Sequence, residues 1–403
     1  MKKILLFAAA ALTMTVGCQK IQELINPDKG QQPVDDNIPV EITFNTNVAA
    51  NLQTKGSGAV EDFDGNQKLF IYGLNVTSGT KEIANQEAKA TVAASENGET
   101  SGALTWADPA FAQFYNGTTD VYEFYGYHVD DADVTTEFSE TNYVSVITID
   151  GTQDIMLAKA TPENDLPVSG GWHETYGTGV DGESLTQEQM DARAKVYSAW
   201  SARRGVTPTL KFEHKLSKLT FSVVNRGSDD LTLQGIDIKT IVDGTLTVVS
   251  KSAERNGGSA LTQGLVKGTT EDYLTLDMED VTLTPKTIAD ATGGADGKPV
   301  DGYYTALKNG TDNTKPATMM VFPGKDYEVV LNLTQAGMTT GRYVTVKINE
   351  ELLEGTAYEL QITLYSLSNI TINAALVEWA EGKSIGIDTE DGSADESETN
   401  PNA

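Results

Sequence analysis

The stretch LKFEHKLSKLTFSVVN, Leu210–Asn225, decides the fold class of this chain. In its first part Leu210, Phe212 and His214 alternate with charged residues, which is typical of a half-buried β-strand. Beyond Ser217 the apolar residues continue in the opposite alternation, so one unbroken strand would turn its apolar side chains to the other face. We therefore expect a bulge or short break near Ser217, with exposed polar side chains around it.

Similar short apolar or alternating segments recur on both sides of this stretch, separated by turn-rich sequence. This spacing favours antiparallel β-sandwiches over alternating strands and helices. The expected strands are 40–48, 69–76, 121–129, 143–149, 154–158, 231–241, 245–249, 273–278, 318–322, 327–333, 342–348, 358–365 and 370–376. Gly73 and Gly126 interrupt two of them and predict bends or bulges.

One helix is expected before the stretch Leu210–Asn225. Thr186 and Gln189 fit a capping box, while Arg203 and Arg204 fit the last helical turn before Gly205. The helix would close a first domain, and the chain of 403 residues is long enough for two. We expect domains at 39–205 and 206–383, followed by an acidic disordered tail at 384–403.

The N-terminus has the pattern of an export signal. Lys2 and Lys3 precede the apolar run 4–16, which is too short for a permanent membrane span. Small residues then lead to Cys18, the only cysteine, as in a bacterial lipobox. We expect residues 1–17 to be a lipoprotein signal peptide, Cys18 to be the lipidated N-terminus, and 18–38 to be a tether. The alternative is an ordinary signal peptide with an incidental thiol.

The composition excludes some partners. A formal net charge of -29 disfavours nucleic acids and anionic lipid surfaces, because both would repel the chain.

No catalytic or metal-binding motif was found in the sequence. The histidines, His128, His173 and His214, have no metal-ligand spacing, and we expect hydrogen-bonded core histidines. We expect no enzyme, no cofactor and no metal. The aromatic residues could line a sugar platform, but core packing is the favoured interpretation; they are Trp106, Phe111, Phe114, Tyr115, Tyr122, Phe124, Tyr125 and Tyr127.

Taken in order, these features resemble the fimbrillin (Mfa-like) family of Bacteroides-type bacteria, which is related to type V pilins. The resemblance rests on the lipobox, the first strand, LTW at Leu104–Trp106, VYEFYGYHV, DIMLA, the opening stretch and the ending ALVEWAEG. It implies an all-β protein with two antiparallel, transthyretin-like β-sandwich domains. It also implies an outer-membrane, surface-exposed lipoprotein that belongs to a fimbrium and supports cell adhesion.

The resemblance also implies a mechanism of assembly. A protease would cut the loop after the first strand, and a strand of the next pilus subunit would replace it. The released donor strand would contain Val40, Ile42, Phe44 and Val48. The cut would fall at Lys55, the only basic residue between Lys29 and Lys68. The alternative is a non-polymerising surface lipoprotein or tip adhesin that binds a host protein or glycan.

Overall fold

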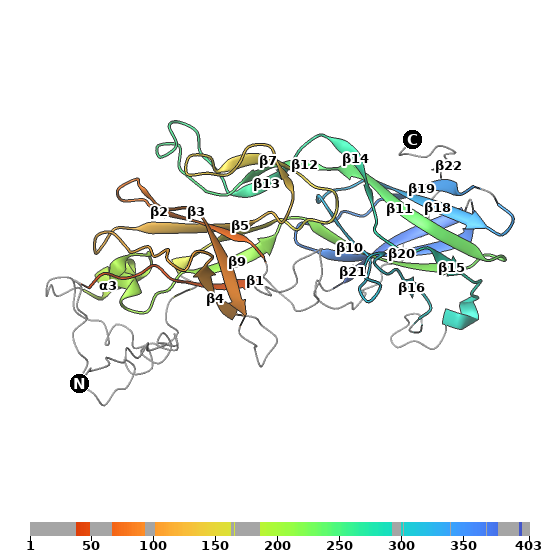
Figure 1. Ribbon diagram of the computed structural model, residues 1–403, viewed down its shortest axis with the longest axis horizontal. Coiled ribbons are helices and arrows are strands. Elements are labelled where there is room, and N and C mark those ends of the chain that lie inside the picture. Colours follow the sequence, from red (N-terminus) through yellow and green to blue (C-terminus); the bar gives the residue numbers. More distant parts are fainter. Residues whose placement is uncertain are drawn as a thin grey trace, which may run out of the picture. The chain divides into compact units, whose positions relative to one another are not determined.

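The computed structural model describes residues 38–48, 67–92, 101–162, 165, 186–291, 300, 302–338, 340–367, 369–377 and 395–396. The described part is built mainly of β-strands with few helices, which confirms the all-β class (Figure 1). The chain separates into two compact units, and every named strand belongs to the larger one, residues 43–113, 122–161 and 208–403.

Seven strands of the larger unit form a closed sheet. They are β1 (Phe44–Val48), β2 (Leu69–Asn75), β3 (Lys81–Val92), β4 (Ser101–Trp106), β5 (Tyr122–His128), β8 (Met156–Lys159) and β9 (Thr209–His214). Their order is β1-β4-β3-β2-β5-β8-β9, and the ring closes where β9 pairs with β1. That last pairing is parallel, whereas the other pairings in this sheet are antiparallel.

The stretch Leu210–Asn225 forms two strands, as its alternation predicts. β9 ends at His214 and β10 (Ser217–Asn225) begins at Ser217, so the expected break is confirmed and lies at residues 215–216. The expected exposure around Ser217 was wrong, because Ser217 and Lys218 are both buried. Ser217 Oγ donates a hydrogen bond of 2.8 Å to the carbonyl of Leu353, which satisfies the hydroxyl inside the protein.

Two further sheets enclose an apolar core whose described residues lie between Leu219 and Ala374. One sheet has the order β16-β10-β20-β21 with β17 on β10, and the other has β14-β11-β18-β19-β22 with β15 on β11. The strands are β11 (Leu231–Ile241), β14 (Glu271–Thr275), β15 (Val281–Leu283), β16 (Thr305–Ala306), β17 (Thr318–Val321), β18 (Tyr327–Gln335), β19 (Arg342–Ile348), β20 (Ala357–Ser366), β21 (Asn369–Val377) and β22 (Asp395–Glu396). A short 3-10 helix, η3, spans Ile288–Ala291.

A fourth sheet combines strands that precede residue 205 in the sequence with strands that follow it. Its order is β13-β12-β7-β6, from β6 (Asp133–Val134), β7 (Val144–Thr148), β12 (Asp243–Thr247) and β13 (Gly264–Lys267). β7 pairs with β12 over residues 144–148 and 243–247. A second apolar cluster accompanies it, and there Tyr72 and Ile147 share a core with Leu246 and Phe322. The domain limits 39–205 and 206–383 stay a prediction.

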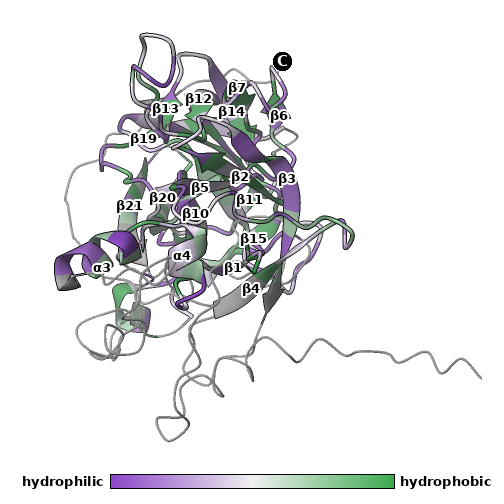
Figure 2. Cartoon of the chain, turned by 90° about the vertical axis from the view of Figure 1, so that its left-hand side faces the viewer, coloured by the Kyte–Doolittle hydropathy of each residue, from purple (hydrophilic) through white to green (hydrophobic). Residues whose placement is uncertain are grey.

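The smaller unit contains the predicted helical region. The capping box of Thr186 and Gln189 is confirmed at the start of α3 (Gln187–Ala194), most of which is coloured hydrophilic in Figure 2. Met190 and Ala194 are buried, and the other described side chains of α3 are exposed or partly exposed. The helix does not continue to residue 204, because Ser198 caps a second helix, α4 (Ala199–Ala202). Arg204 is buried with its guanidinium 4.1 Å from the ring centre of Trp200. Packing on Trp200 therefore holds Arg204, and the expected place of this arginine in the last helical turn was wrong, because α4 has no basic residue in its last turn.

The two strand glycines have different roles. The register of β2 against β3 shifts on both sides of Gly73, which confirms a bulge there. Gly126 instead makes room for a neighbour, since a Cβ atom at this position would lie 2.7 Å from Cζ of Phe212. Phe212 lies in β9, so this glycine lets β9 pack closely over β5.

Candidate functional site

The candidate site is the first strand and the two strands that hold it. β1 pairs antiparallel with β4, where Phe44 lies opposite Leu104 and Asn47 opposite Ser101. On its other side it pairs parallel with β9, where Val48 lies opposite Phe212. β1 is therefore paired along both edges, with β4 over residues 44–47 and with β9 over residues 45–48, and it completes the closed sheet (Figure 1).

Phe44 anchors β1 in the interior of the larger unit. Only 3% of the residue is exposed. Its ring meets Trp106 of β4 edge-on at 5.8 Å between ring centres, and Phe124 of β5 edge-on at 5.0 Å. Trp106 in turn contacts Phe111 at 4.8 Å. Edge-to-face packing of this kind adds to the free energy gained from burying the ring.

The sequence prediction placed the first strand at residues 40–48, and the structure shortens it. Regular pairing begins at Phe44, while Glu41 makes an isolated bridge with Phe114. The carbonyl of Val40 accepts a hydrogen bond of 3.0 Å from the amide of Tyr115, and Ile42 is fully buried. Residues 38–42 and 114–121 belong to the smaller unit, so the predicted donor strand crosses the limit between the two units.

Part of the predicted donor strand lies among the described residues. Ile42 and Phe44 are buried and Glu41, Thr43 and Asn45 are exposed, which confirms the alternation expected there. Val40 is partly exposed, and Val48 ends β1. Cys18 and Lys55 lie outside the described residues.

The strands next to β1 each keep a second partner. β4 pairs with β3 on its far side, with Trp106 opposite Ala88, and β9 pairs with β8, with His214 opposite Met156. The sequence analysis missed β3 entirely. Its alternation is hidden because the buried positions Ala88 and Ala90 carry small side chains and the strand has several charged residues.

Two of the expected core histidines are confirmed. His214 is buried, and its Nδ1 shares a hydrogen bond of 2.9 Å with Oδ2 of Asp154, which is also buried. His128 is buried with its Nδ1 2.9 Å from the carbonyl oxygen of Lys68. His173 lies outside the described residues. Within the described part of the chain, no cluster of three or more His, Cys, Asp or Glu side chains is arranged to hold a metal ion.

The aromatic residues mostly form core, as the favoured interpretation expected. The buried ones are Tyr115, Tyr122, Phe124, Tyr125 and Tyr127, whereas 42% of Phe114 is exposed. Trp106 and Phe111 are partly exposed. Among the described residues, no helix is both long enough and apolar enough to cross a membrane.

Comparison with protein families gives a match over the second half of the chain. Residues 197–379 match the model of a family described as fimbrillin-like. This match confirms the resemblance for that segment. A search of curated proteins gave no match.

Several solved structures align with most of the chain at low identity. A candidate cell adhesion protein from Bacteroides uniformis is 15% identical with a TM-score of 0.43, covering 85% of this chain and 99% of that chain. The tip fimbrial protein Mfa3 of Porphyromonas gingivalis is 11% identical with a TM-score of 0.34, covering 84% and 100%. The fimbrial anchor protein Mfa2 of the same organism is 9% identical with a TM-score of 0.28, covering 84% and 99%.

Proposed function

We propose that the chain is a fimbrial subunit or a fimbria-associated surface protein that exchanges its first strand. The match of residues 197–379 to a fimbrillin-like family supports this proposal. In this proposal Cys18 carries the lipid that anchors the precursor in the outer membrane. A protease cuts at Lys55, β1 leaves, and a strand of another subunit takes its place. The partners are other pilus subunits, and the assembled fibre supports cell adhesion.

The observation that supports this proposal is the position of β1. It is a short strand near the beginning of the chain, yet it is hydrogen-bonded along both edges in the closed sheet. Its removal would leave the facing edges of β4 and β9 without partners. Because each of these strands keeps β3 or β8 on its other side, the opening would have the width of one strand.

The free energy that drives the exchange comes from this opening. Buried backbone N–H and C=O groups need partners, and each one left unsatisfied costs about 1–3 kcal/mol. The space left by Phe44 between Trp106 and Phe124 would also be exposed to water. Burying one large apolar side chain there is worth about 1.5–3 kcal/mol, so the incoming strand should carry a large apolar residue at that position.

The test is to identify the N-terminus of the surface-exposed form by mass spectrometry. Strand release predicts that the mature form lacks residues 1–55 and migrates as a ladder of polymers in mild detergent. A surface pool that keeps its lipidated N-terminus at Cys18 would contradict release and would favour a non-polymerising surface lipoprotein.

A pair of lysine variants tests the cleavage position. Lys55→Ala should abolish the cut and the polymer ladder. Lys68→Ala is the matched control, because Lys68 is the next basic residue along the chain and its side chain is exposed. Its carbonyl, which bonds His128, is unaffected by the substitution. Equal ladders in wild type and Lys55→Ala would refute the assignment of the cut to Lys55.

A further inference from the structure

A shallow cleft with a volume of ≈ 390 Å³ lies over β5 and β8 in the larger unit, and the residues that line it do not belong to β1. Tyr125 and Glu123 of β5 line one part of the cleft. Lys159, at the end of β8, lines one part of it. The loop after β12 covers another part with Lys251 and Arg255. The cleft thus combines residues that are more than a hundred positions apart in the sequence.

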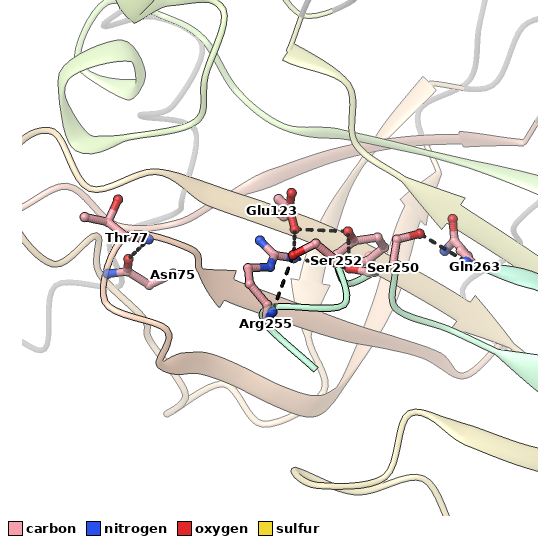
Figure 3. A network of polar contacts seen from close by, with 8 residues as sticks. Asn75, Thr77, Glu123, Ser250, Ser252, Arg255 and Gln263 are labelled. Carbon is pink, nitrogen blue, oxygen red and sulfur yellow. Dashed lines mark hydrogen bonds and ion pairs between the residues drawn. The ribbon is translucent and has the colours of Figure 1, made fainter. Parts of the chain in front are cut away.

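Hydrogen bonds hold the covering loop, residues 250–263, in place. Nε2 of Gln263 donates to the carbonyls of Ala158 at 2.9 Å and Val248 at 2.8 Å. Arg255 reaches across to Glu123, with Nη2 2.8 Å from Oε2 (Figure 3). These bonds fix the loop at both of its sides, so the cleft is formed before any ligand arrives.

Two of the three cations in the cleft are not paired with a carboxylate of the described residues. Arg255 is paired with Glu123. Lys159 and Lys251 instead lie over aromatic rings, 5.4 Å from the ring centre of Tyr125 and 4.5 Å from that of Tyr143, and neither makes an ion pair with a described residue. Unpaired lysines placed together are unusual in a chain with a net charge of -29, where acidic partners are abundant.

The electrostatics around Lys251 point the same way. Burial, together with the neighbouring cations of Arg255 and Lys81, lowers the pKa of the Lys251 amine. Burial is the largest cause and the two cations add to it, so negative charge placed near this amine would favour its charged form. An anion entering the cleft would supply it.

Hydroxyl groups stand next to these cations. Oγ of Ser250 accepts a hydrogen bond of 3.0 Å from the amide of Gln263, and Oγ of Ser252 accepts one of 3.4 Å from the amide of Arg255. Each hydroxyl keeps its own proton to donate. Thr262 adds a third hydroxyl, and Leu261 is the one aliphatic side chain in the lining.

We propose that this cleft binds an acidic sugar residue, whose carboxylate or sulfate is held by Lys159 and Lys251 and whose hydroxyls bond the serine side of the loop. Charge-assisted hydrogen bonds from two ammonium groups suit an oxyanion. The mainly polar lining and the single aliphatic side chain offer little to an apolar partner. The acidity of the rest of the chain repels long polyanions, so a single acidic sugar at the end of a glycan fits best.

The binding test uses 3′-sialyllactose and a sulfated lactose as probes, with neutral lactose as the reference, followed by saturation-transfer NMR and calorimetry. Both acidic probes should bind, lactose should not, and the affinity should fall as salt is added. Equal binding of lactose would overturn the proposal. Inorganic sulfate or an acidic peptide that binds as tightly as the acidic sugars would overturn the assignment to a sugar.

Matched lysine variants locate the binding. Lys159→Gln and Lys251→Gln should each weaken binding about tenfold, since each removes one charge-assisted bond. Lys89→Gln is the control, because Lys89 is an exposed lysine on β3 and the change in net charge is the same. An equal loss in Lys89→Gln would show a general charge effect and overturn the site. Circular dichroism checks that each variant is folded.

Discussion

Phe44→Ala should destabilise the larger unit by about 3–5 kcal/mol, the usual cost of truncating a buried phenylalanine. The structure supports a value in this range, because Phe44 is only 3% exposed and meets Trp106 and Phe124 edge-on. The pairing of β1, which has five residues and lies between β4 and β9, should be weakened most. A loss of about 3 kcal/mol corresponds to roughly a hundredfold larger population of the locally open state, since each 1.4 kcal/mol is tenfold in an equilibrium constant.

Two measurements test this effect in the full chain. Urea unfolding gives the change in the free energy of unfolding, and hydrogen exchange with mass spectrometry shows where protection is lost. Peptides that cover β4 and β9 should exchange faster in Phe44→Ala, while peptides from β18 and β20 should change less. These two strands lie in sheets to which β1 does not belong.

Asn45→Ala is the matched control for Phe44→Ala. Asn45 is the next residue of β1, its side chain is exposed, and its amide keeps the bond of 2.9 Å to the carbonyl of Pro208. This variant should stay within about 0.5 kcal/mol of wild type. If Phe44→Ala matches Asn45→Ala, or if protection is lost equally in β18 and β20, Phe44 does not anchor the strand and the reasoning is refuted.

Three further outcomes follow from the packing. Gly126→Ala should cost about 1–3 kcal/mol in a thermal melt, because its Cβ would lie 2.7 Å from Cζ of Phe212, whereas Gly264→Ala, with open space around it, should cost less. Phe221→Ala should cost about 3–5 kcal/mol in urea, since Phe221 is 2% exposed, and a near-neutral result would show that β10 is misplaced. Burial keeps the pKa of four tyrosines in the folded protein above their pKa in the unfolded chain. Their contribution to the free energy of unfolding should therefore be fully present below about pH 10 and fall as the pH rises above it. An unchanged urea midpoint at higher pH would contradict this. The tyrosines are Tyr72, Tyr125, Tyr127 and Tyr327.

Local patterns in the sequence predicted local features of the fold. The alternation in Leu210–Asn225 indicated two strands and a break, and the structure has β9, β10 and two residues between them. The inward position of His214 indicated a hydrogen-bonded core residue, and Asp154 is its partner. These features depend on side chains within a few residues of each other, and the sequence displays such relations directly.

Pairings between distant strands could not be read in this way. The parallel pairing of β1 with β9 joins residues 45–48 to 209–212, and that of β10 with β20 joins 218–225 to 357–364. Alternation shows that a strand has an inner face, but it does not say which strand lies beside it. The cleft was missed for the same reason, because Lys159 and Lys251 carry no common motif and come together only through the fold.

Topology distinguishes a strand that can be exchanged from one that is merely at an edge. β21 also lies near an end of the chain, but among the described strands it pairs only with β20, so its loss would leave a one-sided edge. An incoming strand there would gain hydrogen bonds along one side. At β1 it would gain them from β4 and β9 together and would close the sheet again. The stronger reason to rebind a strand therefore lies at β1, and replacement there restores a sheet without an exposed edge.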